Sequence, residues 1–281
     1  MSMFGTNPAP PPVETFSQAL KHWRHSRRLS QLELAGRAGV SSRHLCFLES
    51  GRSQPSRDMV RMLGAALDLP LDACNALHLA AGFVPPHAAM EVTAETMPHV
   101  RQALDFMLSQ QEPYPAIVVD GHWDVKLRNA AAVRLLGPFR KCCDMEADVA
   151  DNAMHTVFHP RGLRQFIVNW AEFAGAMIQL LHGDVARGSA VSLRLLEEIK
   201  RYPDLNGVWR PAARHHSTGP VMTMQLRMGN LGLSFFSAFT TFALTSDAGL
   251  QQLKIESFFP ADTATAEFAR ISARAPVEIS R

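Results

Sequence analysis

The stretch from residue 30 to 52 constrains the fold of this chain more than any other feature. Ser30 is followed three residues later by Glu33, a pairing typical of the capping box that starts a helix. Gly39 comes directly after the predicted helix 31–38, where a chain leaving a helix favours glycine. Ser41 is suited to cap a second helix. The stretch therefore predicts two short helices joined by a tight turn.

Apolar residues at helical spacing surround this stretch. They predict a helix before it and two helices after it, the first of these beginning at Pro55-Ser56. Within the helix 31–38, we expect Leu32 and Ala35 on one apolar side. Five short helices over residues 14–84 indicate an all-α domain, preceded by a proline-rich leader at 1–13.

Charge is distributed unevenly along the 281 residues. The whole chain has 28 Lys and Arg against 26 Asp and Glu, a formal net charge of +2. Residues 21–61 hold nine basic and three acidic side chains, a balance of +6. Residues 1–20 contribute −1, so the remaining 220 residues carry −3. This asymmetry indicates a polyanionic partner for the basic segment alone.

The two short helices and their turn form a helix-turn-helix motif. The apolar set packs the second helix across the first, and the opposite face of the second helix carries Ser42, Arg43, His44 and Phe47. A helix fits the major groove of DNA, and the residues of its first turn reach the base edges. The motif therefore predicts a DNA-reading helix.

The pattern changes after Pro85-Pro86. Alternating apolar residues predict strands, and longer periodic runs predict helices. We expect strands at 116–120, 123–128, 221–228, 231–238 and 250–259, and helices at 92–111, 129–136, 162–181 and 191–200. Residues 92–268 are thus predicted to form a mixed α+β domain, with a tail at 269–281.

Composition narrows the class of protein. The hydrophobic fraction of 47% is ordinary for a globular chain. The four cysteines form no CxxC pair, and the N-terminus has no recognisable signal peptide. No apolar run reaches the ~18 residues that a membrane span needs. We therefore expect a cytoplasmic protein.

Sites for metal or covalent chemistry are not predicted. His155 and His159 have the spacing of a zinc-peptidase helix, but Thr156 occupies the position where such a helix needs Glu. Nothing indicates that Cys142 and Cys143 have a lowered pKa. Neither a GxSxG elbow nor a nucleotide-binding glycine motif is present. We expect no enzymatic activity, no metal and no cofactor.

Residues 16–83 resemble the phage-repressor-like (XRE, or Cro/C1-type) helix-turn-helix domain, including Gln31 and the sequence ESGR at 49–52. The resemblance implies that Gln31 contacts phosphate and that residues 41–44 face the groove. The predicted DNA contacts are Gln31, Ser41, Ser42, Arg43, His44, Phe47, Arg52 and Arg28. Phe47 either touches a thymine methyl group or belongs to the core. Arg24, Arg28 and Arg52 either contact phosphates or are surface charges.

A narrower resemblance covers most of the chain. The sequences EPYPA at 112–116, HPRGL at 159–163, NWA at 169–171, LSFF at 233–236 and FFPAD at 258–262 are similar to those of MmyB-type regulators. That resemblance implies a PAS-like ligand-binding domain in the second half of the chain, on a transcription regulator.

The phenylalanine-rich strands of the second domain either pack a solid core or enclose an apolar pocket. The resemblance favours a pocket for a small hydrophobic, acyl-chain-like ligand, such as a fatty acid. The predicted ligand contacts are His159, Arg164, Asn169, Phe235 and Phe239.

Together these features predict a homodimeric, cytoplasmic transcription regulator that binds a double-stranded operator and senses a small molecule. One reading helix covers few base pairs, so a symmetric dimer on two half-sites is expected. Two alternatives stay open. The second domain could serve only for dimerisation or recruitment of a protein partner, or it could be a tethered enzyme.

Overall fold

The computed structural model describes residues 15–86, 96–186, 189–205, 221–242 and 247–274. The predicted leader at 1–13 lies outside these residues. The chain divides into two compact units between residues 88 and 89.

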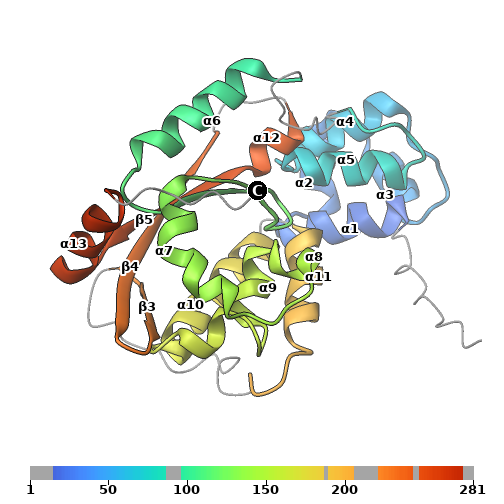
Figure 1. Ribbon diagram of the computed structural model, residues 1–281. Helices are drawn as coiled ribbons and strands as arrows, with labels where there is room; N and C mark the ends of the chain where they lie inside the picture. Colours follow the sequence, from blue (N-terminus) through green and yellow to red (C-terminus); the bar gives the residue numbers. More distant parts are fainter. Residues whose placement is uncertain (1–14, 87–95, 187–188, 206–220, 243–246, 275–281) are drawn as a thin grey trace, which may run out of the picture. The chain divides into compact units, whose positions relative to one another are not determined.

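The first unit consists of five helices (Figure 1). They are α1 (Phe16–Ser26), α2 (Gln31–Ala38), α3 (Ser42–Glu49), α4 (Arg57–Ala66) and α5 (Leu71–Ala80). The predicted all-α domain of five helices is confirmed.

Local side-chain hydrogen bonds set where these helices begin. Ser30 and Glu33 form the predicted capping box: the Ser30 hydroxyl accepts the Glu33 amide at 3.1 Å, and the Glu33 carboxylate accepts the Ser30 amide at 2.7 Å. The hydroxyls of Ser41 and Ser56 cap α3 and α4 by accepting the amides of His44 and Met59. Gly39 ends α2 with φ of 68°, in the left-handed region. The turn between α2 and α3 is therefore encoded locally.

Leucines fill the core of the first unit. Leu34 and Ala35 of α2 are buried against Leu45 and Leu48 of α3. Leu32, expected on the apolar side of α2, is instead 73% exposed. The prediction for Leu32 was wrong because α2 turns residues 34, 35 and 38 inward, and Leu32 lies on another face.

A five-stranded antiparallel sheet forms the centre of the second unit, in the order β2-β1-β5-β4-β3. The strands are β1 (Ala116–Val119), β2 (Val125–Arg128), β3 (Thr223–Met228), β4 (Leu231–Thr241) and β5 (Lys254–Pro260). The remaining elements are α6 (Pro98–Gln110), α7 (Ala130–Lys141), α8 (Ala147–Ala150), α9 (Ala153–Phe158), the 3₁₀ helix η1 (Leu163–Phe166), α10 (Trp170–Ala186), α11 (Ala190–Ile199), α12 (Ala248–Gln252) and α13 (Thr263–Ser272). The predicted mixed α+β class is confirmed.

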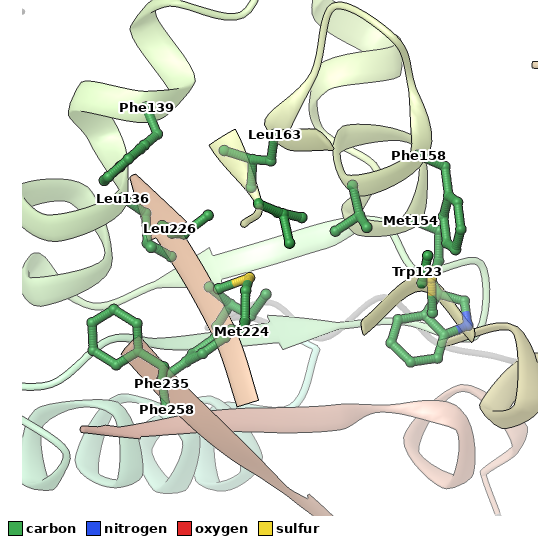
Figure 2. Packing of buried hydrophobic residues seen from close by; sticks show 14 of the residues in the cluster. Trp123, Leu136, Phe139, Met154, Phe158, Leu163, Met224, Leu226, Phe235 and Phe258 are labelled. Atoms are coloured by element: carbon green, nitrogen blue, oxygen red, sulfur yellow. The ribbon is translucent and has the colours of Figure 1, made fainter. Parts of the chain in front are cut away.

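Both faces of β1 are buried, because side chains alternate along a strand and helices lie on both sides. Ile117 and Val119 join a large core with α7, α9 and α10. Figure 2 labels Leu136 of α7 and Phe158 of α9 in this core. Ala116 and Val118 join a smaller core with α6 and α12. The sheet is thus covered on both faces (Figure 1).

The predicted single helix 162–181 was wrong. The chain forms η1, breaks at residues 167–169, and resumes as α10. In the break, Ile167 forms a β-bridge with Leu226, and the Val168 amide donates to the Gln225 carbonyl at 2.8 Å. Backbone pairing with β3 therefore replaces the helical hydrogen bonds, a long-range effect that apolar spacing does not reveal.

Other predicted boundaries also need correction. The segment expected to be a strand from 250 forms α12, capped by Asp247, and β5 begins only at Lys254. The helix expected at 92–111 begins at Pro98, and residues 92–95 lie outside the described residues. The helix expected to end at Leu136 continues through Pro138 to Lys141, which buries Phe139 completely.

Besides α12, three helices of the second unit were not predicted: α8, α9 and α13. The first two are only four and six residues long, too short for a clear period. Helix α13 continues past residue 268 and buries Ala269, so the folded unit extends at least to residue 272.

Gly36 within α2 and Gly39 directly after it test the local encoding of the turn. Nothing lies within 4 Å of an added Cβ at Gly36 or at Gly39, but only Gly39 has a positive φ. We expect Gly39→Ala to lower the free energy of unfolding by about 1 kcal/mol through backbone strain. Gly36→Ala should instead raise it by up to about 1 kcal/mol through helix propensity.

Chemical denaturation of both variants measures this difference. Equal effects of the two substitutions would contradict the assignment of strain to Gly39.

Candidate functional site

Helix α3 presents the polar residues predicted to face DNA. Ser42 and Arg43 are exposed, as is the capping residue Ser41. His44 is half-buried, and its amide donates to the Ser41 hydroxyl at 3.2 Å. The first turn of α3 therefore keeps its polar groups outward, which is the requirement for reaching base edges.

Phe47 lies beside Arg43 on the same face of α3. It is half-buried, and the Arg43 guanidinium carbon lies 5.6 Å from the centre of its ring. Residues four apart are neighbours on a helix surface, and a guanidinium over an aromatic face is stabilised by the ring quadrupole. Phe47 thus limits the conformations open to the Arg43 side chain.

A buried ion pair holds α3 in place. Glu49 accepts hydrogen bonds from Arg24 Nε at 2.6 Å and Nη2 at 2.9 Å, and from Gln31 Nε2 at 2.8 Å. The side chains of Arg24 and Glu49 are 9% and 3% exposed. Burial by itself would raise the pKa of Glu49, but the hydrogen bonds from Arg24 and Gln31 outweigh it and the pKa is lowered. The network joins α1, α2 and α3.

Arg24 is therefore neither a phosphate contact nor a surface charge, and that prediction was wrong. Removing Arg24 and Glu49 from the count leaves eight basic and two acidic side chains in residues 21–61, still +6. Arg28 and Arg52 are exposed within this segment. Gln31 donates inward to Glu49, at the start of α2.

The second unit contains a cavity of about 80 Å³ on the inner face of its sheet. Strands β1, β2, β3 and β5 form one wall, and α7, α9, η1 and α10 form the other. Most of its lining is apolar and includes Leu136, Leu163, Phe173, Met177, Met224 and Phe258. Figure 2 shows several of these side chains around the same space.

Two arginines line the more exposed side of the cavity. Arg128 and Arg140 share one carboxylate oxygen of Asp151, at 2.7 Å and 3.4 Å, and both side chains are about a third exposed. Burial, followed by the charge of Arg128, lowers the pKa of Arg140. Two guanidinium groups thus face a single acid, which leaves positive charge at the cavity wall.

Glu256 lies deeper in the same wall and is 8% exposed. Its carboxyl is hydrogen-bonded to Ser237. Burial raises its pKa to about 7, because a charged carboxylate is poorly solvated there.

The three polar residues predicted to contact ligand do not line the cavity. Arg164 donates to the Pro203 carbonyl at 2.8 Å and lies over the Trp170 ring. Asn169 donates to the Thr223 carbonyl and accepts the Gln225 amide. Both side chains stabilise the start of α10: Asn169 hydrogen-bonds it to the backbone of β3, and Arg164 packs on Trp170, its first residue.

His159 packs edge-on against Tyr202, whose hydroxyl lies 2.7 Å from Nδ1 of His155. Phe235 is fully buried against Phe258, and Phe239 packs edge-on against Trp123. None of the five predicted ligand residues lies in the cavity lining.

Sequence reasoning missed the polar lining residues Trp123, Arg128, Arg140 and Glu256. One signal was present: Glu256 has the same strand face as the apolar Phe258, two residues later. A carboxyl in such a position is seldom buried without a partner.

Comparison with known families decides the classification. The model of the family described as "MmyB-like transcription regulator ligand binding domain" matches residues 100–271, more than half of the chain. The chain belongs to this family. A helix-turn-helix domain model matches residues 15–77. The predicted relationship to MmyB-type regulators is confirmed, and both matched families are regulator or DNA-binding families rather than enzyme families.

Other comparisons add little. No curated protein matches the chain. A solved structure of an RNA-binding light-oxygen-voltage receptor is 11% identical, with a TM-score of 0.24, over 92% of this chain and 62% of that chain. The chain thus spans about 62% of that receptor chain, and the likeness is too weak to support a functional conclusion.

Neither a membrane-spanning helix nor a metal-binding cluster is found among the described residues. None of their helices combines the length and apolarity needed to cross a membrane. Nor do they bring together three or more His, Cys, Asp or Glu side chains in a group that could hold a metal ion.

The buried carboxyl makes a pH-dependent contribution to stability. Because the pKa of Glu256 is about 7 in the fold and 4.5 as the ordinary value, the folded chain holds a proton that the unfolded chain loses between these pH values. The protonated Glu256 side chain therefore contributes its full share of the unfolding free energy below pH 4.5, and this contribution is lost as pH rises to about 7.

Glu256→Gln removes this titration. As pH rises from 4 to 8, we expect the unfolding free energy of wild type to fall by about 3 kcal/mol relative to that of the variant. Denaturant titrations across that range measure the fall. A constant difference between the two proteins would contradict the raised pKa.

Proposed function

We propose that this chain is a sequence-specific transcription regulator whose DNA binding is controlled by a small hydrophobic acid held in the second unit. The observation that carries the proposal is the apolar cavity with Arg128 and Arg140 on its exposed side. An apolar chain favours the interior, and a carboxylate favours the two guanidinium groups. The match to a ligand-binding domain family supports the same conclusion.

The DNA-reading residue is Arg43 in this proposal. Its exposed position in the first turn of α3 and its contact with Phe47 favour a bidentate hydrogen bond to guanine. Ser41, Ser42 and His44 complete the surface that faces the groove. Gln31, Arg28 and Arg52 contact phosphates, which position the helix without specifying sequence.

Two chains bind one operator. A single helix of this kind covers few base pairs, so two copies on two half-sites supply the affinity and selectivity that one copy lacks. The second unit, whose charge is not basic overall, supplies the dimer contacts.

The ligand acts by expanding the cavity. Its volume of about 80 Å³ is well below the ~300 Å³ of a typical ligand pocket. Met177 and Phe173 of α10 line one wall, and a flexible methionine adapts readily to a new shape. The ligand therefore binds better to a conformation in which α10 has moved, and this difference in affinity is what shifts the regulator between states.

The remaining assignments follow from this function. The regulator acts in the cytoplasm, has no catalytic role and requires no cofactor or metal. After a leader at 1–13, residues 14–84 read DNA, and the residues from 92 to the end of α13 at residue 272 bind ligand and the second copy.

Replacement of Arg43 tests the reading helix. We expect Arg43→Ala to lower discrimination against a mutated operator base by about 1–3 kcal/mol, because the bidentate contact is lost. Arg43→Lys keeps the charge but lacks the planar fork, so it should lose discrimination while keeping the salt dependence of binding.

Fluorescence anisotropy with operators containing one or two half-sites measures both quantities and the number of chains bound. Unchanged discrimination in Arg43→Ala would refute the assignment of this residue.

Octanoic acid tests the ligand class. Calorimetric titration of the full chain should detect binding, and Arg140→Gln should weaken it about tenfold through loss of a charge-assisted hydrogen bond. Arg161→Gln is the matched control, since Arg161 pairs with Asp144 on the surface and does not line the cavity.

Equal affinity of the two variants would place the acid outside the cavity. No binding at all, together with no small molecule in mass spectra of the purified chain, would favour a second unit that serves only for dimerisation or partner recruitment.

A further inference from the structure

The cavity wall contains a polar hydrogen without a partner. Trp123 is 1% exposed and lines the cavity, and its indole Nε1 has no hydrogen-bond partner among the described residues. An indole N–H can only donate. A buried donor left unpaired costs about 1–3 kcal/mol, so native structures seldom keep one.

Glu256 lines the same cavity as this indole. It is directly opposite Phe239 in the β4–β5 pairing, and the Trp123 and Phe239 rings are in edge contact, with centres 5.8 Å apart. Lys254, two residues before Glu256 on the same face, has its ammonium 4.3 Å from the centre of the Trp123 ring. The indole N–H and the Glu256 carboxyl are therefore both polar groups in the lining of one largely apolar cavity, on either side of the Phe239 ring contact.

These two groups are complementary to a hydroxyl group. A hydroxyl oxygen accepts a hydrogen bond from the indole N–H, and its hydrogen is donated to a carboxyl oxygen. An unsubstituted alkyl chain would leave the indole N–H unpaired and the Glu256 carboxyl with only its bond to Ser237, and it would exclude the water that could otherwise reach both groups.

We propose that the ligand is a hydroxylated carboxylic acid, whose carboxylate lies at Arg128 and Arg140 and whose chain hydroxyl lies between Trp123 and Glu256. The proposal rests on the proposed function, because it specifies the ligand of the same cavity. Trp123 and Glu256 then determine specificity within the class of hydrophobic acids.

The sheet register separates the two polar subsites. Ile117 is opposite Arg128 on one side and opposite Glu256 on the other. Two strand spacings of about 4.8 Å therefore separate the backbone of Arg128 from that of Glu256. A ligand that uses both must carry its hydroxyl away from its carboxylate, with apolar carbons between them against Ile117.

A tightly bound water could fill the same position, since the cavity is large enough for one. Such a water would pair with the two polar groups whether or not the bound acid has a hydroxyl, so the cavity would then show no preference for a hydroxylated acid. The two occupants therefore differ in what calorimetry measures.

The experiment compares octanoic acid with a set of hydroxyoctanoic acids that differ in the position of the hydroxyl. Titrations use the full chain. We expect the best isomer to bind wild type at least about tenfold more tightly than octanoic acid, the factor that one net hydrogen bond supplies.

Three variants test whether Trp123 and Glu256 cause the preference for a hydroxyoctanoic acid over octanoic acid. Trp123→Phe keeps an aromatic ring but removes the indole N–H donor, and Glu256→Met replaces the carboxyl with an apolar side chain of similar length. Each should bring the ratio of affinities close to one while octanoic acid still binds. Glu256→Gln keeps hydrogen-bonding groups and should retain most of the preference.

Trp170→Phe is the matched control. The Trp170 indole nitrogen is also buried and unpartnered among the described residues, but Trp170 does not line the cavity. Its replacement should leave the ratio unchanged, which separates a ligand contact from a general effect of losing an indole.

Each result has a definite meaning. If no hydroxyoctanoic acid exceeds octanoic acid in wild type, or if the preference survives in both Trp123→Phe and Glu256→Met, the hydroxyl subsite is wrong and the acid-binding function stands. If none of the acids binds, both proposals fail. The wild-type comparison decides the matter even where a variant does not fold.

Discussion

The buried pair of Arg24 and Glu49 is the interaction on which the DNA-reading unit depends. Glu49 is the last residue of α3, Arg24 is in α1, and Gln31 at the start of α2 completes the set of hydrogen bonds. Three helices that are each too short to be stable alone are thereby fixed against one another. Loss of either charge would leave the other buried without a counter-ion, which is far more costly than loss of a surface pair. The outward face of α3 owes its position to this inner contact.

The antiparallel sheet has the corresponding role in the second unit. Its register sets Arg128, Ile117, Glu256 and Phe239 in one row across four strands, all on the face toward α7 and α10. One row thus contributes a cationic end, an apolar middle and a buried acid to the same wall. The helices on that face are held partly by Asn169, which ties the start of α10 to β3. The cavity is a consequence of how these helices meet the sheet, and its lining comes from segments more than 130 residues apart, such as Ile117 and Phe258.

Sequence patterns predicted the first unit in detail because its structure is encoded locally. Capping by Ser30 and Ser41, the left-handed turn at Gly39, and the leucine spacing all act within a few residues. The second unit was predicted only in class. Its helix 162–181 is broken by pairing with β3, and α12 replaces the start of a predicted strand. Both departures come from contacts between segments far apart in the chain, which local periodicity does not contain.

The sequence by itself determined the helix-turn-helix, its basic surroundings and which residues of α3 are candidates for reading DNA, because helical period, caps and charge are properties of neighbouring residues. Only the tertiary structure decided which charges are surface charges and which are buried: Arg24 turned inward to Glu49, while Arg43 stayed exposed. Only the tertiary structure, too, moved the candidate ligand site from His159, Arg164 and Asn169 to Trp123, Arg128, Arg140 and Glu256. The physical reason is that burial and cavity lining depend on which distant strands and helices meet.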